Sequence, residues 1–326
     1  MTDIKKDVVL ITGAGGQLGS ELANGLIEIY GKEHVISTDL RIPEAETEHL
    51  FLELDVMDKK RLGDLIRTYR VTQVYHLAAI LSAKGESNPL LSWQINMEGL
   101  LNILEAAREF QLKVYWPSSI ATFGANTPSN PTPQFTITEP GTVYGISKHA
   151  GELWCQYYHE KFGVDVRSLR YPGLIGYKSL PGGGTTDYAV DIFHKAIKGG
   201  DFTCFLKENT VLPMMYMPDA VRATLELMHA DANKITVRTS YNIQAMSFSP
   251  KEIYGKIKKH YPEFEMDYAP DFRQKIAETW PQKLEDTLAQ KDWGWKPEFD
   301  LPAMVDDMLL NLKKRVNYKS KVLEEI

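Results

Sequence analysis

The sequence predicts an α/β fold, a doubly wound parallel sheet followed by a smaller C-terminal α/β domain. Short apolar, β-branched runs alternate with amphipathic segments between residues 8 and 170, as in parallel sheets whose strands are buried on both faces. A glycine-rich turn separates the first run from the first helix, and polar or small residues end the later runs. Ligands of such sheets bind at the carboxyl ends of the strands.

The elements follow one another in a regular order. We predict strands at residues 8–12, 35–38, 51–56, 73–79, 113–116, 166–170 and 263–268. Apolar stripes at helical spacing predict helices at residues 20–30, 58–69, 90–108, 143–163, 187–197, 284–291 and 301–315, with a further helix starting after Ser249. We expect a cofactor-binding domain of residues 1–176 plus about 210–243, and a substrate-binding domain of about 177–209 plus 244–326.

Composition narrows the class of protein. The 326 residues carry a net charge of −6 and no basic stripe, so we expect no nucleic acid partner. No apolar run reaches the length of a membrane span, and the first residues lack the apolar region of a signal peptide. Cys155 and Cys204 are the only cysteines, and neither they nor the histidines have metal-ligand spacing. We therefore expect a cytoplasmic protein with no metal and no membrane partner.

The glycine turn predicts a dinucleotide site. Glycines at 13, 16 and 19 stand between a strand and a helix, the context in which glycines let the backbone approach a pyrophosphate at a helix start. The alternative is a glycine-rich turn without ligand, which is the less favoured interpretation in this context. The residues predicted to contact the cofactor here are Gly13, Gly16, Gln17, Leu18 and Gly19.

Asp39 ends the second strand, twenty residues after Gly19, the spacing of the acid that binds the adenosine ribose. A carboxylate there favours NAD over NADP, although nearby Arg41 is a mild signal for NADP. Asp39 alone is also a common turn former.

The ends of the other strands meet at the same edge. They add Leu40, Asp55, Val56, Leu77, Ala78, Ala79, Tyr171 and Pro172 to the predicted NAD contacts, although simple packing explains the two alanines nearly as well.

Tyr144 and Lys148 lie four residues apart on one predicted helix, and therefore on one face of it. A nearby cation favours a phenolate and lowers the phenol pKa, so this pair is one way to build a general base. An isolated match would more often be a half-buried tyrosine beside a solvated lysine.

Taken together, these motifs resemble the extended short-chain dehydrogenase/reductase superfamily, which has a Rossmann domain. The resemblance covers the glycine motif, Asp39, Asp55, residues 76–79, Asn96, residues 118–124, Tyr144, Lys148 and residues 169–173. It implies that Tyr144 carries the proton, Ser119 bonds the reacting oxygen, Lys148 holds the nicotinamide ribose, and Asn96 supports the helix behind Lys148. It also implies that the backbone at Leu174 contacts the nicotinamide, and that a homodimer forms through helices 90–108 and 143–163.

Residues 179–189, 280–282 and 292–295 are similar to the epimerase-like L-threonine 3-dehydrogenases. That branch implies NAD-dependent oxidation of L-threonine to L-2-amino-3-ketobutyrate, in threonine catabolism. The predicted substrate contacts are Ser82, Ser119, Tyr144, Thr185 and Thr186. Nucleotide-sugar enzymes of the superfamily generally place a diphosphate-binding arginine where this chain has Leu212, which favours a small substrate.

Two other functions stay open. A nucleotide-sugar 4-epimerase or dehydratase would use the same Tyr144, Ser119 and Lys148 with a different pocket. A non-catalytic regulator that senses NAD is less favoured, because such proteins often lose the tyrosine or the lysine, and both are present here.

Overall fold

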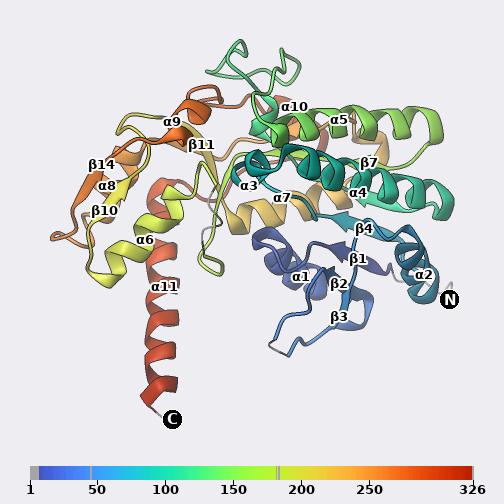
Figure 1. Cartoon of the computed structure of the whole chain (residues 1–326), viewed down its shortest axis with the longest axis horizontal. Helices are drawn as coiled ribbons and strands as arrows, with labels where there is room; N and C mark the ends of the chain where they lie inside the picture. Colours follow the sequence, from blue (N-terminus) through green and yellow to red (C-terminus); the bar gives the residue numbers. More distant parts are fainter. Residues whose placement is uncertain (1–6, 45, 181, 183, 325–326) are drawn as a thin grey trace.

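The computed structural model describes residues 7–44, 46–180, 182 and 184–324. Its centre is a six-stranded parallel sheet in the order β3-β2-β1-β4-β5-β7 (Figure 1). The strand order reverses between β1 and β4, and a crevice at such a switch point is where doubly wound sheets bind ligands. The strands are β1 Val9–Thr12, β2 Val35–Asp39, β3 Leu50–Glu53, β4 Gln73–His76, β5 Lys113–Tyr115 and β7 Val166–Arg167.

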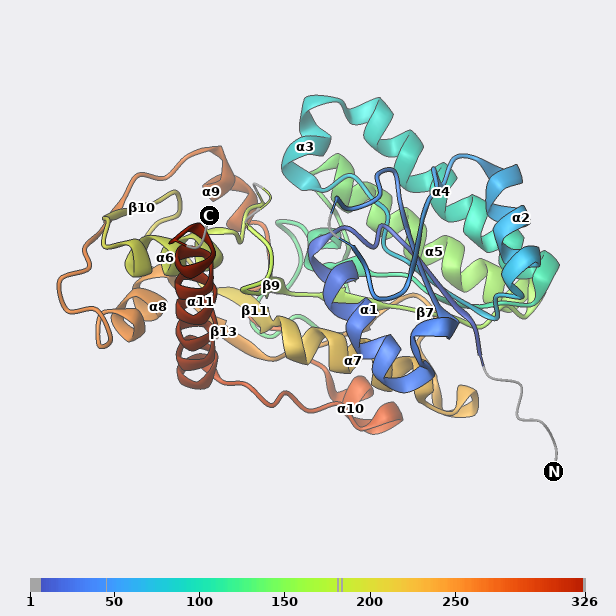
Figure 2. The same cartoon turned by 90° about the horizontal axis from the view of Figure 1, so that it is seen from below.

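Helices cover both faces of this sheet, which confirms the predicted doubly wound fold. Figure 2 shows α1 Gln17–Tyr30 and α7 Met217–His229 side by side on one face. The other face is covered by α2 Lys59–Tyr69, α4 Pro89–Phe110 and α5 Val143–Phe162. Val9 and Ile11 of β1 pack with α1 and α7, whereas Leu10 packs toward the other layer, as alternating side chains of a strand must.

The predicted sixth strand, residues 166–170, is wrong as a single element. β7 pairs with β5, whereas β8 Leu169–Tyr171 pairs with β6 Ser118–Ser119 and with β12 Tyr241–Asn242. Pro117 separates β5 from β6, and proline has no N–H with which to continue a ladder. The ladder between the β5–β6 segment and the β7–β8 segment is therefore broken at Pro117. The break divides the first segment into β5 and β6, and divides the second into β7 and β8 at Ser168.

Smaller differences affect the predicted site. The first helix begins at Gln17, so Gln17, Leu18 and Gly19 form its first turn. β3 ends at Glu53, which leaves Asp55 in the following turn. A short helix that the sequence did not predict, α3 Ser82–Ser87, precedes α4.

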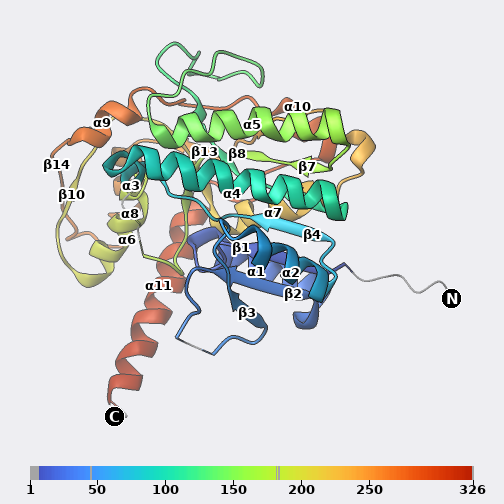
Figure 3. The ribbon, with the colours of Figure 1, turned by 45° about the vertical axis from the view of Figure 1, so that its right-hand side comes forward.

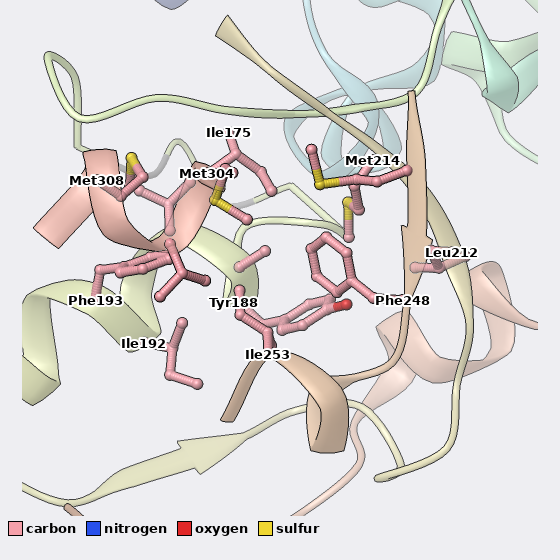
Figure 4. Packing of buried hydrophobic residues seen from close by; sticks show 14 of the residues in the cluster. Ile175, Tyr188, Ile192, Phe193, Leu212, Met214, Phe248, Ile253, Met304 and Met308 are labelled. Carbon is pink, nitrogen blue, oxygen red and sulfur yellow. The ribbon is translucent and has the colours of Figure 1, made fainter. Parts of the chain in front are cut away.

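The C-terminal part forms a second apolar core beside the sheet. Figure 4 shows side chains from α6 Tyr188–Lys198, β11 Leu212–Tyr216, β13 Met246–Phe248, α8 Pro250–Ile257 and α11 Leu301–Glu324 packed together. The remaining elements are β9 Gly173–Ile175, β10 Phe202–Cys204, β14 Met266–Tyr268, α9 Phe272–Ala277, α10 Thr287–Trp293 and 3₁₀ turns at Lys32–His34, Ile120–Thr122 and Ala232–Lys234.

β11 pairs with both β9 and β13, which the predicted domain division places on opposite sides of a boundary. The division into a cofactor-binding and a substrate-binding domain therefore stays a prediction, and β11 lies where the two predicted domains meet. None of the helices in the described ranges is both long enough and apolar enough to cross a membrane.

Candidate active site at the carboxyl ends of the strands

The glycine turn after β1 lies tightly against the end of β4. Gly13 has a φ of +73°, and a Cβ atom there would lie 2.5 Å from the nitrogen of Ala78. A Cβ on Gly19 would lie 2.6 Å from the carbonyl oxygen of Gly13. Gly16 precedes α1 without any side-chain cap, and the first N–H groups of a helix have no partners within it. This cradle fits a pyrophosphate.

Asp39 and the glycine turn are joined directly. The Asp39 carboxylate accepts hydrogen bonds from the N–H of Gly15 at 2.9 Å and from the N–H of Leu40 at 2.7 Å. Asp55 accepts from the N–H of Met57 at 2.9 Å and is exposed, whereas the Val56 carbonyl accepts from Asn102 at 2.9 Å and the Val56 side chain is buried. The Asp39 carboxylate is half-buried and the Asp55 side chain is exposed, so both can meet a ligand at this edge.

Asn96 connects the end of β4 to α5. Its amide accepts from the N–H of Ile80 at 2.7 Å, and donates to the Ile80 carbonyl at 3.0 Å and to the Ser147 hydroxyl at 3.2 Å. Ser147 in turn donates to the carbonyl of Tyr144 at 2.8 Å. Asn96 therefore supports α5 through Ser147, the neighbour of Lys148, and positions the segment of Leu77, Ala78 and Ala79 before Ile80.

Ser119, Tyr144 and Lys148 converge from β6 and α5. Ser119 pairs with Tyr171 across β6 and β8. The start of α5 lies so close to the turn after Ser119 that a Cβ on Gly145 would be 2.1 Å from the Ala121 carbonyl oxygen. This contact brings Tyr144 within hydrogen-bonding range of the Ser119 side chain.

Lys148 is held from two sides. Its ammonium donates a 2.6 Å hydrogen bond to the carbonyl of Pro117 and lies 4.4 Å from the centroid of the Trp116 ring. The centroid of the Tyr144 ring is 5.6 Å from the same ammonium, so the two residues do face each other as predicted.

The pKa values differ from the sequence prediction. Burial raises the pKa of Tyr144 to about 12, and this effect is larger than the opposing effect of the hydrogen bond with the Ser119 side chain. Burial also lowers the pKa of Lys148 to about 7, against the opposing influence of Cys155 and Glu152. In the protein alone, burial therefore outweighs the lowering of the Tyr144 pKa that Lys148 is expected to cause, and that role of Lys148 stays a prediction. The reason is desolvation, which disfavours the charged form of both side chains.

The other predicted residues lie around this trio with different accessibility. Tyr171 is buried, and its hydroxyl accepts from the Tyr115 hydroxyl at 2.6 Å, so only its backbone can meet a cofactor. Pro172 is buried between β8 and β9, and Leu174 is half-buried. Thr186 packs on the backbone of Gly173, where a Cβ would lie 2.7 Å from the Thr186 Cβ.

Ser82 and Thr185 are buried, at the start of α3 and just before α6. The predicted loop of residues 182–186 is only partly described, since Gly183 lies outside the described residues. Leu212 is fully buried in the second core (Figure 4). Within the described ranges, no three His, Cys, Asp or Glu side chains are grouped to hold a metal ion.

Sequence reasoning missed several residues behind the trio. Glu86 accepts a 2.8 Å hydrogen bond from the N–H of Val143 at the start of α5. Ser118, Glu152 and Arg170 form a buried hydrogen-bonded cluster. The one signal in the sequence was the position of Glu152, one helical turn after Lys148.

Comparisons with known proteins place the chain in a family and give several similar structures. The model of the NAD dependent epimerase/dehydratase family matches residues 9–244. A GalE-like L-threonine dehydrogenase from Cupriavidus necator, in its holo form, is 54% identical, with a TM-score of 0.92 over 94% of this chain and 99% of that one. A monomeric L-threonine 3-dehydrogenase from a metagenome, in its apo form, is 46% identical, with a TM-score of 0.92 over 94% and 99%.

An uncharacterized epimerase/dehydratase from Staphylococcus haemolyticus is 46% identical over 315 residues, covering 95% of this chain and 99% of its own. The predicted superfamily, the Rossmann fold and NAD as cofactor are thus confirmed. The chain belongs to the NAD dependent epimerase/dehydratase family, within the extended short-chain dehydrogenase/reductases.

Proposed function

We propose that this protein oxidises L-threonine at its β-hydroxyl to L-2-amino-3-ketobutyrate, with NAD as the acceptor, as a step of threonine catabolism. The observation that carries the proposal is the convergence of Tyr144, Ser119 and Lys148 at the strand ends that also carry the glycine turn. This arrangement puts a proton acceptor and a hydroxyl donor beside a dinucleotide site.

The described residues fit NAD. The N–H groups of residues 17–19 would hold its pyrophosphate, Asp39 its adenosine ribose, and Lys148 its nicotinamide ribose. When bound, NAD supplies a hydride acceptor and a further positive charge. We assign the remaining contacts to the backbone of Leu77, Ala78, Pro172 and Leu174.

The chain's own residues would handle the proton. Ser119 orients the β-hydroxyl oxygen by a hydrogen bond, and Tyr144 as phenolate accepts the hydroxyl proton while the C–H hydrogen leaves as hydride and the C=O bond forms. Because burial raises the Tyr144 pKa to about 12, this step depends on positive charge near the phenol.

Two features support a small amino acid as substrate. Leu212 is buried in an apolar core, so this position offers no cation for a sugar-linked diphosphate. Thr186 lies against Gly173, two residues beyond Tyr171 and one before Leu174. We assign the ammonium and carboxylate contacts to Ser82, Thr185 and Thr186. Two solved relatives are named as L-threonine dehydrogenases, which supports L-threonine as the substrate.

The test with purified protein is NADH formation across L-threonine, L-serine and other small β-hydroxy amino acids, together with product analysis of UDP-glucose and UDP-galactose, since an epimerase returns the hydride to the sugar and forms no net NADH. We expect saturable turnover with L-threonine, weaker turnover with the other amino acids, and none with the UDP-sugars. Turnover of a UDP-sugar with threonine inert would establish the epimerase alternative. NAD binding without turnover of any compound would favour the regulator.

We also propose a homodimer through α4 and α5, which lie side by side in Figure 3. Large apolar side chains are exposed on both helices: Leu90, Leu91, Trp93, Ile146, Leu153, Trp154, Tyr157 and Phe162. Light scattering should report a dimer that Trp154→Glu dissociates. A monomeric wild type, like the metagenomic relative, would contradict the proposal.

A cytoplasmic location is proposed from the two cysteines, Cys155 and Cys204, which are both free thiols and buried. Fractionation of source cells should recover the protein with the cytoplasmic enzymes, and recovery outside the cytoplasm would reject this location.

A further inference from the structure

A buried carboxylate extends the row of functional side chains on α5. Glu152 follows Lys148 by four residues, as Lys148 follows Tyr144, so the three lie along one face of the helix. The Glu152 side chain is 2% exposed and receives Arg170 in a bidentate ion pair at 2.8 and 2.7 Å. Charges this deeply buried need partners, and this pair is fully partnered.

Glu152 also binds the residue next to Ser119. The Ser118 hydroxyl donates a 2.5 Å hydrogen bond to the same carboxylate oxygen that accepts from the Arg170 Nε. Ser118 lies opposite Arg170 in the pairing of β6 with β8, as Ser119 lies opposite Tyr171. Glu152 therefore joins α5, β6 and β8 directly behind Ser119.

The same segment carries the acceptor of Lys148. The Pro117 carbonyl receives the Lys148 ammonium at 2.6 Å, and Pro117 immediately precedes Ser118. Two consecutive residues, Pro117 and Ser118, are thus each held by one side chain of α5. A shift of this segment would displace Ser119 and Lys148 together.

Glu152 is also the charged group on α5 that stabilises the ammonium. Burial lowers the pKa of Lys148, and Cys155 and Glu152 act against this shift. Burial raises the pKa of the Cys155 thiol well above its usual value, so the thiol stays neutral. Of the other groups nearby, Tyr144 is protonated, His76 on β4 has a pKa lowered by burial to about 3, and Arg170 is paired with Glu152.

We propose that Glu152 is a positioning residue for the dehydrogenation, which holds Ser119 and Lys148 in their working places through Ser118 and Arg170. The kcat measurement for this proposal rests on the proposed function. The measurement of NAD binding does not depend on that function. A role in stability alone would change the melting temperature without changing either readout.

The first experiment removes one hydrogen bond of the cluster. Ser118→Ala deletes the donor to Glu152 and leaves the Arg170 ion pair intact. Ser168→Ala is the matched control, since Ser168 is equally buried at 2% exposure and bonds Ser240 at 2.8 Å, away from Glu152. We expect kcat for L-threonine to fall roughly tenfold in Ser118→Ala, as for a small misplacement of a reacting group, and KM for NAD to rise, because Lys148 shifts with the same segment. Ser168→Ala should keep the wild-type kcat.

The second experiment removes the charge. NAD affinity should fall as pH rises and the Lys148 ammonium loses its proton. In Glu152→Gln this fall should begin at a lower pH than in the wild type, because the buried Lys148 ammonium has lost the stabilising charge of Glu152. Ser118→Ala should keep the wild-type pH dependence. If Glu152→Gln does not fold, the kcat values of Ser118→Ala and of its control Ser168→Ala still test the positioning role of Glu152.

Wild-type kcat in Ser118→Ala, or an equal loss in Ser168→Ala, would overturn the positioning role, as would an unchanged pH dependence in a folded Glu152→Gln. If wild-type protein does not oxidise threonine at all, the proposed function fails instead. The NAD titrations would then still test Glu152.

Discussion

The carboxylate of Asp39 accepts a 2.9 Å hydrogen bond from the N–H of Gly15, so the end of β2 is tied to the glycine turn before any ligand arrives. Its second oxygen is held by the N–H of Leu40 at 2.7 Å. A carboxylate fixed in this way is preorganised to accept from ribose hydroxyls and repels a 2′-phosphate.

Asp39→Ala should weaken NAD binding and narrow the preference for NAD over NADP, because the ribose acceptor and the repelling charge are both lost. Titration with each nucleotide, followed by tryptophan fluorescence, measures the two affinities. Asp64→Ala, which removes an exposed carboxylate paired with Arg67 on α2, is the control for charge alone. A wild type that prefers NADP would show that Arg41 is the discriminating residue.

Gly19→Ala should abolish NAD binding and destabilise the protein. The added Cβ would lie 2.6 Å from the Gly13 carbonyl oxygen and 2.7 Å from the Ala14 Cα, and these backbone atoms cannot move aside without opening the turn. Gly25→Ala on the same helix meets only side-chain carbons at 3.1 Å and should bind NAD normally. Thermal melting with and without NAD distinguishes the two, and NAD-induced stabilisation of Gly19→Ala would contradict the assigned cradle.

Tyr144→Phe should lower kcat for L-threonine by roughly 10² to 10⁴, the usual contribution of acid–base catalysis, while NAD affinity is retained. The ring stays in place and only the proton acceptor is removed. Tyr157→Phe, on the exposed side of α5, should turn over normally. Steady-state kinetics with parallel NAD titrations provide the test. More than about a tenth of wild-type activity in Tyr144→Phe would exclude the general-base role.

Lys148→Met should stabilise the protein most at or below pH 7. With a pKa lowered from 10.5 to about 7, the folded state releases a proton between these values that the unfolded state keeps. The unfolded state then binds more protons, so the stability of the wild type rises with pH by up to about 1.4 kcal/mol per unit in this window, and the advantage of Lys148→Met shrinks.

Urea unfolding at pH 6, 8 and 10 measures this difference. Lys251→Met, whose exposed ammonium pairs with Glu208, should show a small difference that does not vary across these pH values. A pH-independent effect of Lys148→Met would mean that Lys148 is not desolvated as the fold indicates.

Thr186→Ala should raise KM for L-threonine more than KM for NAD, because it removes a hydroxyl from the proposed substrate loop and leaves a polar group of the substrate unpaired. Thr203→Ala, an exposed threonine on β10, is the control. Equal KM values for threonine in the wild type and Thr186→Ala would remove Thr186 from the substrate site.

The layout of the cofactor half could be predicted from the amino-acid sequence alone. Alternating apolar runs predicted the strands and helices of the sheet, and the glycine turn, Asp39, and the spacing of Tyr144 and Lys148 marked the edge where they meet. These features follow from local periodicity and from the rule that parallel strands end at one edge, so they need no knowledge of distant contacts.

The surroundings of those residues could not be predicted from the sequence and follow from the three-dimensional fold. The division at Ser168, the bridge from Asn96 to Ile80 and Ser147, and the cluster of Ser118, Glu152 and Arg170 all depend on partners far apart in the chain. The same holds for the raised pKa of Tyr144, because desolvation depends on how deeply the fold buries a group. Spacing along a helix sets which side chains face each other, but burial sets which of them carry a charge.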